Sequence, residues 1–159
     1  MWTMLTRGST QWAQIGWRRH KNSSGNYARW TFIQWTDASG HFWESDYSAA
    51  TNTYPLYNTL YDPTSKTFQF ERDFTLYPDE PSESWIPNNV ELLGETHNYD
   101  DQMPGGTGAH AEFYGAQYRL DGGSPHNMGT PATTTNSSIY GAVSAVSDDY
   151  RIWDKGCTS

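Results

Sequence analysis

The sequence contains one cysteine, Cys157, so no disulfide can form within the chain and the fold does not depend on one. It contains no apolar run near the roughly 20 residues that a transmembrane helix needs. Cationic side chains are scarce, because 10 Lys and Arg stand against 18 Asp and Glu, for a formal net charge of −8 at pH 7. Nucleic-acid binding depends on basic side chains that neutralise phosphates. This balance therefore argues against nucleic acid and against anionic membranes as partners.

Helical periodicity is also missing. We find no convincing stretch of eleven residues in which apolar side chains follow the helical spacing i, i+3, i+4 and i+7. Large rings supply much of the apolar mass instead, since aromatic residues make up 16% of the chain, with 8 Trp and 11 Tyr. Such rings favour β-strands, and they also line grooves that bind sugars or peptides. Composition alone leaves both uses open.

Short aromatic-rich stretches that alternate apolar and polar residues recur along the chain, each bounded by Gly, Asn, Pro or Asp. Such stretches are typical of the strands of a sandwich or a barrel. We therefore predict an all-β, single-domain antiparallel β-sandwich over residues 1–159, with two packed, curved sheets of the jelly-roll or concanavalin type. The predicted strands are Trp2–Leu5, Trp12–Arg18, Tyr27–Thr36, His41–Glu44, Tyr54–Tyr61, Thr67–Phe74, Val90–Asn98, Ala111–Leu120, Ser138–Ala145 and Tyr150–Trp153.

Turn-forming residues indicate how some of these strands connect. Asp62-Pro63 followed by small polar residues predicts a hairpin between the strands on either side of it. The segment Asn22–Asn26 predicts a second hairpin in the same way. Residues Pro78–Asn89 contain three prolines, so this stretch cannot be a central strand and is predicted to be a long crossing loop.

Two segments place polar side chains on stretches that otherwise have the pattern of buried strands. One is 12–17, around Gln14, and the other is 91–97, which contains Glu91 and Glu95. Polar side chains are costly in such places unless something uses or satisfies them. A lone Gln or Glu on an exposed strand face is ordinary, so a functional interpretation depends on both segments together.

The spacing of the two glutamates limits what they can do alone. Alternate side chains of a strand share a face, so Glu91 and Glu95 point the same way and lie about 13 Å apart at roughly 3.3 Å per residue. That separation is too large for the carboxylate pair of a glycosidase. A catalytic glutamate here needs a partner from another strand, and Gln14 and Gln34 are the two candidates.

No set of metal ligands stands out. The five histidines are scattered without a zinc spacing, and the serines lie in turns rather than in a Ser-His-Asp arrangement. Asp100 and Asp101 could hold a Ca²⁺ ion together with loop carbonyls, but a solvated acidic loop is the simpler interpretation. We therefore predict no metal and no cofactor.

The ordered set of these segments resembles the glutamic peptidases, and in particular the neprosin-like family. Gln14–Trp17 with Gly25–Thr36 is similar to the strand pair that carries the first catalytic residue of neprosins, and Gly94-Glu95 to the Gly-Glu that supplies the second. The resemblance runs from Gln14 to Tyr118. Its other matches are Tyr61-Asp62-Pro63, Trp85-Ile86-Pro87, Gln102-Met103-Pro104-Gly105-Gly106 and Tyr114–Tyr118.

The chain departs from the neprosin pattern in three ways. The first catalytic position is Gln14, as in the fungal glutamic peptidases, where neprosins have Glu. Residues 104–106 replace a Gly-Ser-Gly loop, and the cysteines that brace neprosins are missing. The fungal Glu-x-x-x-Glu spacing also fits Glu91 and Glu95, so both remain candidates, with Glu95 preferred for its match to Gly-Glu.

The resemblance implies a glutamic-type endopeptidase that acts on a peptide or protein substrate. Glu95 would activate the attacking water and Gln14 would stabilise the oxyanion. The expected substrate-binding residues are Trp12, Gln34, Trp17 and Tyr114. The alternative is a non-catalytic sandwich that binds carbohydrate through exposed Trp and Tyr or has a structural role. The Asn, Thr, Ser and aromatic content favours a secreted protein.

Overall fold

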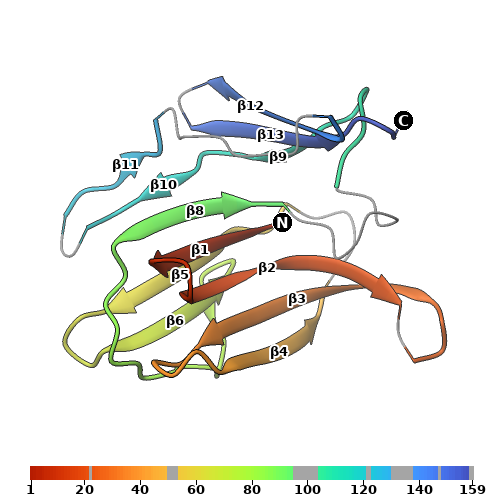
Figure 1. Cartoon of the computed structure of the whole chain (residues 1–159). Coiled ribbons are helices and arrows are strands. Elements are labelled where there is room, and N and C mark those ends of the chain that lie inside the picture. Colours follow the sequence, from red (N-terminus) through yellow and green to blue (C-terminus); the bar gives the residue numbers. More distant parts are fainter. Residues whose placement is uncertain are drawn as a thin grey trace. The chain divides into compact units, whose positions relative to one another are not determined.

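The computed structural model describes residues 1–21, 23–49, 54–94, 104–120, 123–129, 138–146 and 148–157. All the strand pairs in these residues are antiparallel, so the predicted all-β antiparallel sandwich is confirmed (Figure 1). No helix that could cross a membrane is present among them. The strands are β1 (Trp2–Arg7), β2 (Gln11–Lys21), β3 (Tyr27–Thr36), β4 (Phe42–Ser48), β5 (Tyr57–Asp62), β6 (Thr67–Arg72), β7 (Thr75–Leu76), β8 (Asn89–Leu93), β9 (Ala111–Phe113), β10 (Gln117–Tyr118), β11 (His126–Asn127), β12 (Tyr140–Val146) and β13 (Asp149–Asp154).

The chain divides into two compact units, Met1–Leu93 and Gly94–Ser159. The first unit contains a five-stranded sheet in the order β4-β3-β2-β1-β8 and a three-stranded sheet in the order β5-β6-β7. The second contains β12-β13-β9 and the short pair β10-β11. That the 159 residues form one domain stays a prediction.

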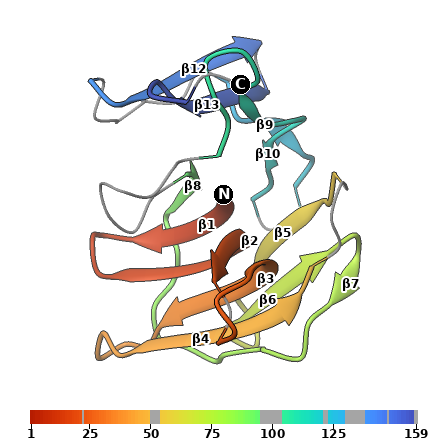
Figure 2. The same ribbon diagram turned by 90° about the vertical axis from the view of Figure 1, so that its right-hand side faces the viewer.

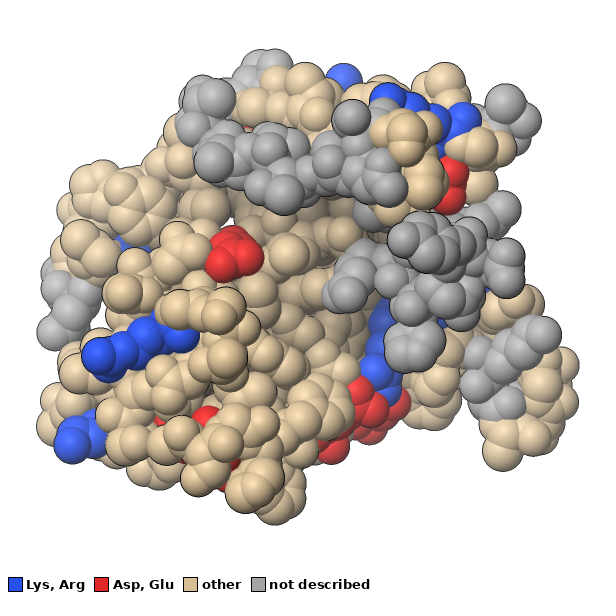
Figure 3. Space-filling model, viewed as in Figure 1, with Lys and Arg blue, Asp and Glu red and all other residues tan. Residues whose placement is uncertain are grey.

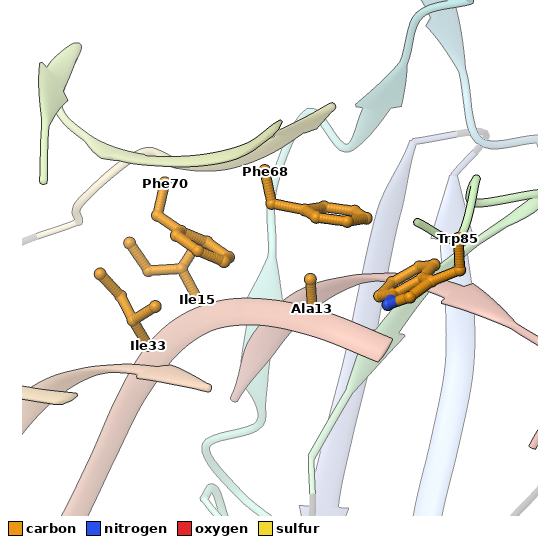
Figure 4. Packing of buried hydrophobic residues seen from close by; sticks show 6 residues of the cluster. All are labelled: Ala13, Ile15, Ile33, Phe68, Phe70 and Trp85. Atoms are coloured by element: carbon orange, nitrogen blue, oxygen red, sulfur yellow. The ribbon is translucent and has the colours of Figure 1, made fainter. Parts of the chain in front are cut away.

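The first unit is a sandwich whose two sheets lie face to face, as Figure 2 shows. Alternate residues of β2 and β3 face the second sheet, where Ala13, Ile15 and Ile33 are fully buried. From the opposite sheet, Phe68 and Phe70 pack against them, and Trp85 closes the cluster from the crossing loop (Figure 4). The Trp85 indole Nε1 donates to the backbone carbonyl of Thr36 at 3.0 Å, which satisfies the one polar atom of this ring.

The core fixes which way Gln14 points. Ala13 and Ile15 are its neighbours in β2, and both have their side chains in the core. Because successive side chains of a strand point to opposite faces, Gln14 must lie on the face turned away from the core.

The two predicted hairpins are confirmed. β2 and β3 pair from Ala13↔Trp35 to Lys21↔Tyr27, and Gly25 in their turn has a φ of 78°. β5 and β6 pair around the Asp62 turn, where the Asp62 carboxylate accepts a hydrogen bond from the Thr64 backbone N–H at 2.8 Å. An Asp that bonds to the backbone two residues on is the standard chemistry of such a turn.

Several predicted strand boundaries were wrong. The predicted strand Thr67–Phe74 ends at Arg72, because Asp73 and Phe74 have φ values of 51° and 62° and turn the chain into β7. The predicted strand Ala111–Leu120 is split into β9 and β10 around Gly115, whose φ is 60°. Strands β1, β2 and β4 are longer than predicted, β5 begins at Tyr57 rather than Tyr54, and residues 95–98 of the predicted Val90–Asn98 strand lie outside the described residues.

The second unit packs around the β12-β13-β9 sheet. Trp153 of β13 stacks on His110 with ring centroids 4.2 Å apart. The ring also covers Gly141 of β12, where a Cβ atom would lie 2.0 Å from Trp153 Cε2. Any larger residue at position 141 would displace this ring.

Candidate active site

Gln14 lies in the middle of a row of side chains that crosses the five-stranded sheet. The strand registers align Glu91 with Met4, Met4 with Gln14, Gln14 with Gln34, and Gln34 with Glu44. Directly opposite residues of antiparallel strands share a face. The row therefore places a glutamate two strands away from Gln14 on each side. We call it the Gln14 row, and the sheet face that carries it the Gln14 face.

A chain of hydrogen bonds occupies one half of the row. Gln14 Nε2 donates to Gln34 Oε1 at 2.5 Å, and Gln34 Nε2 donates to Glu44 Oε2. Glu44 in turn accepts two hydrogen bonds from Arg18, from Nη1 at 2.8 Å and from Nη2 at 2.7 Å. Arg18 also bonds to Asp46 at 2.5 Å. Gln14 is only 6% exposed, so its carboxamide depends on this series of hydrogen bonds for a partner.

Arg18, the cation at the end of this series of hydrogen bonds, favours the charged form of Glu44. The hydrogen bond from Arg18 is the largest influence that lowers the pKa of the Glu44 carboxyl, and the hydrogen bond from Gln34 adds to it. Figure 3 shows the acidic and basic side chains gathered side by side over β2 to β4, and a separate acidic group over β8. Glu44 therefore keeps its negative charge to a lower pH than an ordinary glutamate does.

The other half of the row has a different character. Met4 separates Gln14 from Glu91, so the two polar residues lie two strand spacings, about 9–10 Å, apart between their Cα atoms. Glu91 Oε1 accepts hydrogen bonds from Thr6 Oγ1 at 3.0 Å and from Asn89 Nδ2 at 2.9 Å. These bonds leave Glu91 Oε2 without a bonded partner in the part of the chain that the structure describes. A carboxylate and a carboxamide thus flank an apolar side chain.

Aromatic pairs lie on both sides of the Gln14 row. Trp2 and Phe32 meet edge to face above Gly16, with ring centroids 5.7 Å apart. On the other side Trp12 and Phe42 lie 5.7 Å apart. These pairs are two residues along the strands from the Gln14 row, about 6.6 Å away. Alternate side chains of an extended peptide have the same repeat.

The Gln14 face also carries buried N–H groups without acceptors. Trp2 Nε1, Arg18 Nε and Trp30 Nε1 are buried and have no hydrogen-bond partner among the described residues. All three residues belong to this face by register. Leaving a buried donor unpaired costs about 1–3 kcal/mol.

A shallow depression of about 510 Å³ lies at one end of the Gln14 face. Trp12 and Phe42 form its aromatic part, while Gln11, Ser39 and Gly40 lie at its polar part. Phe42 is 54% exposed, so its ring is accessible to a ligand. Rings beside amide and hydroxyl groups suit either an apolar side chain of a peptide or one face of a sugar.

The structure brings some of the predicted site residues together and separates others. Gln14, Glu91, Gln34 and Trp12 share the Gln14 face. Trp17 lies on the opposite face of β2, where the Arg29 guanidinium is 5.6 Å from the centre of its ring. Tyr114 belongs to the second unit, where it is 83% exposed, and Glu95 is outside the described residues.

The sequence did not identify Arg18 and Glu44 as parts of the site. Arg18 lies in the basic cluster Arg18-Arg19-His20-Lys21, whose sequence is typical of solvated charge, and no motif points to Glu44. The alternation Phe42, Glu44, Asp46 on β4 was the available signal, because it puts two carboxylates on one face beside Arg18.

The described residues contain no group of three or more His, Cys, Asp or Glu side chains placed to hold a metal ion. Asp100 and Asp101, the candidate Ca²⁺ ligands, are outside the described residues. Comparison with known proteins finds no matching family model, no matching curated protein and no matching solved structure.

Proposed function

We propose that the protein is a glutamic-type endopeptidase whose substrate lies extended across the Gln14 face. The observation that carries this proposal is the Gln14 row itself, where a buried carboxamide donor and the Glu91 carboxylate flank Met4. The aromatic pairs on either side of the row give places for substrate side chains.

The chemistry needs one carboxylate and one neutral donor. The carboxylate removes a proton from a water molecule as the water oxygen attacks the scissile carbonyl carbon. The Gln14 amide N–H donates to the oxygen that gains negative charge, which stabilises the tetrahedral intermediate. The protonated glutamate then gives its proton to the leaving nitrogen as the C–N bond breaks. These reaction steps need no metal ion and no cofactor.

Two glutamates compete for the role of general base. Glu91 is supported by its place on the Gln14 face and by its unbonded Oε2 atom. Glu95 is supported by the resemblance of Gly94-Glu95 to the neprosin motif. The proposal assigns the base to Glu95 on that resemblance and keeps Glu91, which lies on the Gln14 face, as the alternative.

Single substitutions distinguish these roles. Cleavage of a denatured protein should be followed by mass spectrometry between pH 3 and pH 8 for Glu95→Gln, Glu91→Gln and the control Glu80→Gln. Loss of a general base lowers the rate by about 10²–10⁴-fold. We expect that loss for Glu95→Gln, a smaller loss for Glu91→Gln, and no loss for Glu80→Gln. Full loss for Glu91→Gln alone would transfer the role to Glu91.

Carbohydrate binding is a second candidate function, favoured by the depression at Trp12 and Phe42. A sugar ring stacked on these aromatic residues would use Gln11 and Ser39 as hydrogen-bonding partners. A glycan array with wild type and Trp12→Ala tests this function. Glycan binding that disappears in Trp12→Ala supports it, whereas binding unaffected by this substitution excludes the depression as the site.

A further inference from the structure

A carboxamide has two ends of nearly the same size and opposite hydrogen-bonding character. Its NH₂ group donates and its oxygen accepts, so hydrogen-bond partners decide which way round it lies. If Gln14 is to stabilise an oxyanion, its NH₂ group must be held toward the reacting oxygen. A flipped Gln14 would present its own carbonyl oxygen instead, and two partial negative charges would repel each other. The orientation of this one side chain therefore matters to the proposed chemistry.

Glu44 determines the orientation of the next residue in the Gln14 row. An ionised carboxylate has only acceptor atoms. Arg18 donates to both of its oxygens, and the same hydrogen bonds lower the pKa of Glu44. The other groups that face it are Gln34, His20 and Asp46. Among these groups only Gln34 has a carboxamide. Because Glu44 can only accept, Gln34 has to turn its NH₂ group toward it.

This constraint passes from Gln34 to Gln14. With its NH₂ group on Glu44, Gln34 can present only its Oε1 atom to Gln14. Gln14 must therefore donate from Nε2, which is the arrangement found at 2.5 Å. Only one of the two hydrogens on Nε2 is used in this bond. The second has no partner in the described part of the chain and is left for a ligand on the Gln14 face.

We infer that Arg18, Glu44 and Gln34 are positioning residues that hold Gln14 with its NH₂ group available as a donor. This inference rests on the proposed function for its catalytic consequence, but the orientation can be measured without any activity. The three residues need not touch the substrate. They act through an unbroken series of hydrogen bonds in which each acceptor fixes the direction of the next amide.

Two substitutions act on the series in opposite ways. Gln34→Met keeps the length of the side chain and removes both hydrogen bonds, so Gln14 becomes free to flip. Glu44→Lys replaces an acceptor-only group by a donor-only group. It should turn Gln34 round, and Gln34 should then turn Gln14 round. Gln69→Met and Glu80→Lys are matched controls, because Gln69 Nε2 donates to Glu80 Oε1 at 3.4 Å outside the Gln14 row.

NMR of the full chain reads the direction of each hydrogen bond. In wild type, a coupling across the bond should join Gln14 Nε2 to the Gln34 side-chain carbonyl carbon. In Glu44→Lys the coupling should run from Gln34 Nε2 to the Gln14 carbonyl carbon, and in Gln34→Met it should be absent. The controls should keep the wild-type pattern. A wild-type direction that survives in Glu44→Lys would overturn the inference.

Kinetics test the catalytic consequence separately. Gln34→Met breaks the charge-assisted series of hydrogen bonds. This loss should lower kcat by about tenfold or more, with KM changed far less. Glu44→Lys should approach the loss caused by removing the donor itself, about 10²–10³-fold. Unchanged kcat in both variants, with the NMR signals showing that Gln14 has flipped, would overturn the positioning role. If wild type cleaves no peptide at all, the proposed function fails, while the NMR measurement still decides the orientation of Gln14.

Discussion

Removing the Phe68 ring should destabilise the first unit strongly. Phe68 is fully buried, and its ring lies 4.4 Å from Trp85 and 4.9 Å from Tyr61, measured between centroids. Replacing a buried Phe by Ala costs about 3–5 kcal/mol, because the transfer free energy of the ring is lost and a cavity remains. The upper part of this range applies here, since both ring pairs are lost with the side chain. A domain of ordinary stability, about 5–15 kcal/mol, would lose a third or more of its free energy of unfolding.

Urea unfolding followed by circular dichroism measures this effect. With a slope of about 1–3 kcal/mol per M, the midpoint for Phe68→Ala should fall by about 2 M. Phe74→Ala is the matched control, since Phe74 is 79% exposed and has no part in the core cluster. Its midpoint should move by the equivalent of less than about 0.5 kcal/mol. Similar shifts for the two variants would refute the packing that we describe between the two sheets.

Three further predictions concern charge and close packing. Because Arg18 lowers the pKa of Glu44, the pair stabilises the fold above the unfolded pKa of the carboxyl and less as pH falls through the folded pKa. Wild type and Glu44→Gln should differ in free energy of unfolding by less than about 1 kcal/mol, because the pair is partly exposed. This difference, measured by urea unfolding, should shrink from pH 6 to pH 3. Gly141→Ala should lower the melting temperature of the second unit, because its Cβ would lie 2.0 Å from Trp153 Cε2, and an unchanged melting temperature would contradict this packing. Burial and the hydrogen bond from its hydroxyl to the Asp79 carboxylate raise the pKa of Tyr47 to about 12. NMR titration of Asp79→Asn should therefore show a lower pKa for Tyr47.

Strand alternation was enough to predict the fold class, and it also separates Gln14 from its two neighbours in β2. The sequence Ala13-Gln14-Ile15 alternates small or apolar residues with a polar one, and the structure has both apolar side chains in the core. Gln34 was predicted as a candidate partner of a catalytic glutamate and as a substrate-binding residue, and the register of β2 and β3 places it opposite Gln14.

The rest of the Gln14 row could not be predicted from alternation. Whether Glu44 lies opposite Gln34 depends on the turn between β3 and β4, and a shift of one residue would have put it on the other face. The early end of β6 was hidden for another reason. Phe74 has a φ of 62°, a conformation that bulky residues seldom adopt, so its sequence gives no sign of a turn. Gly115, by contrast, was a visible sign of the break between β9 and β10.

The cleavage rate of Gln14→Leu tests the central claim most directly. The substitution keeps the volume of the side chain and removes its N–H donors, and circular dichroism confirms that the fold is retained. If the Gln14 face hydrolyses peptides, wild type should cleave a denatured protein and Gln14→Leu should be slower by about 10²–10³-fold. Equal rates for the two proteins, or no cleavage by folded wild type between pH 3 and pH 8, would contradict the account.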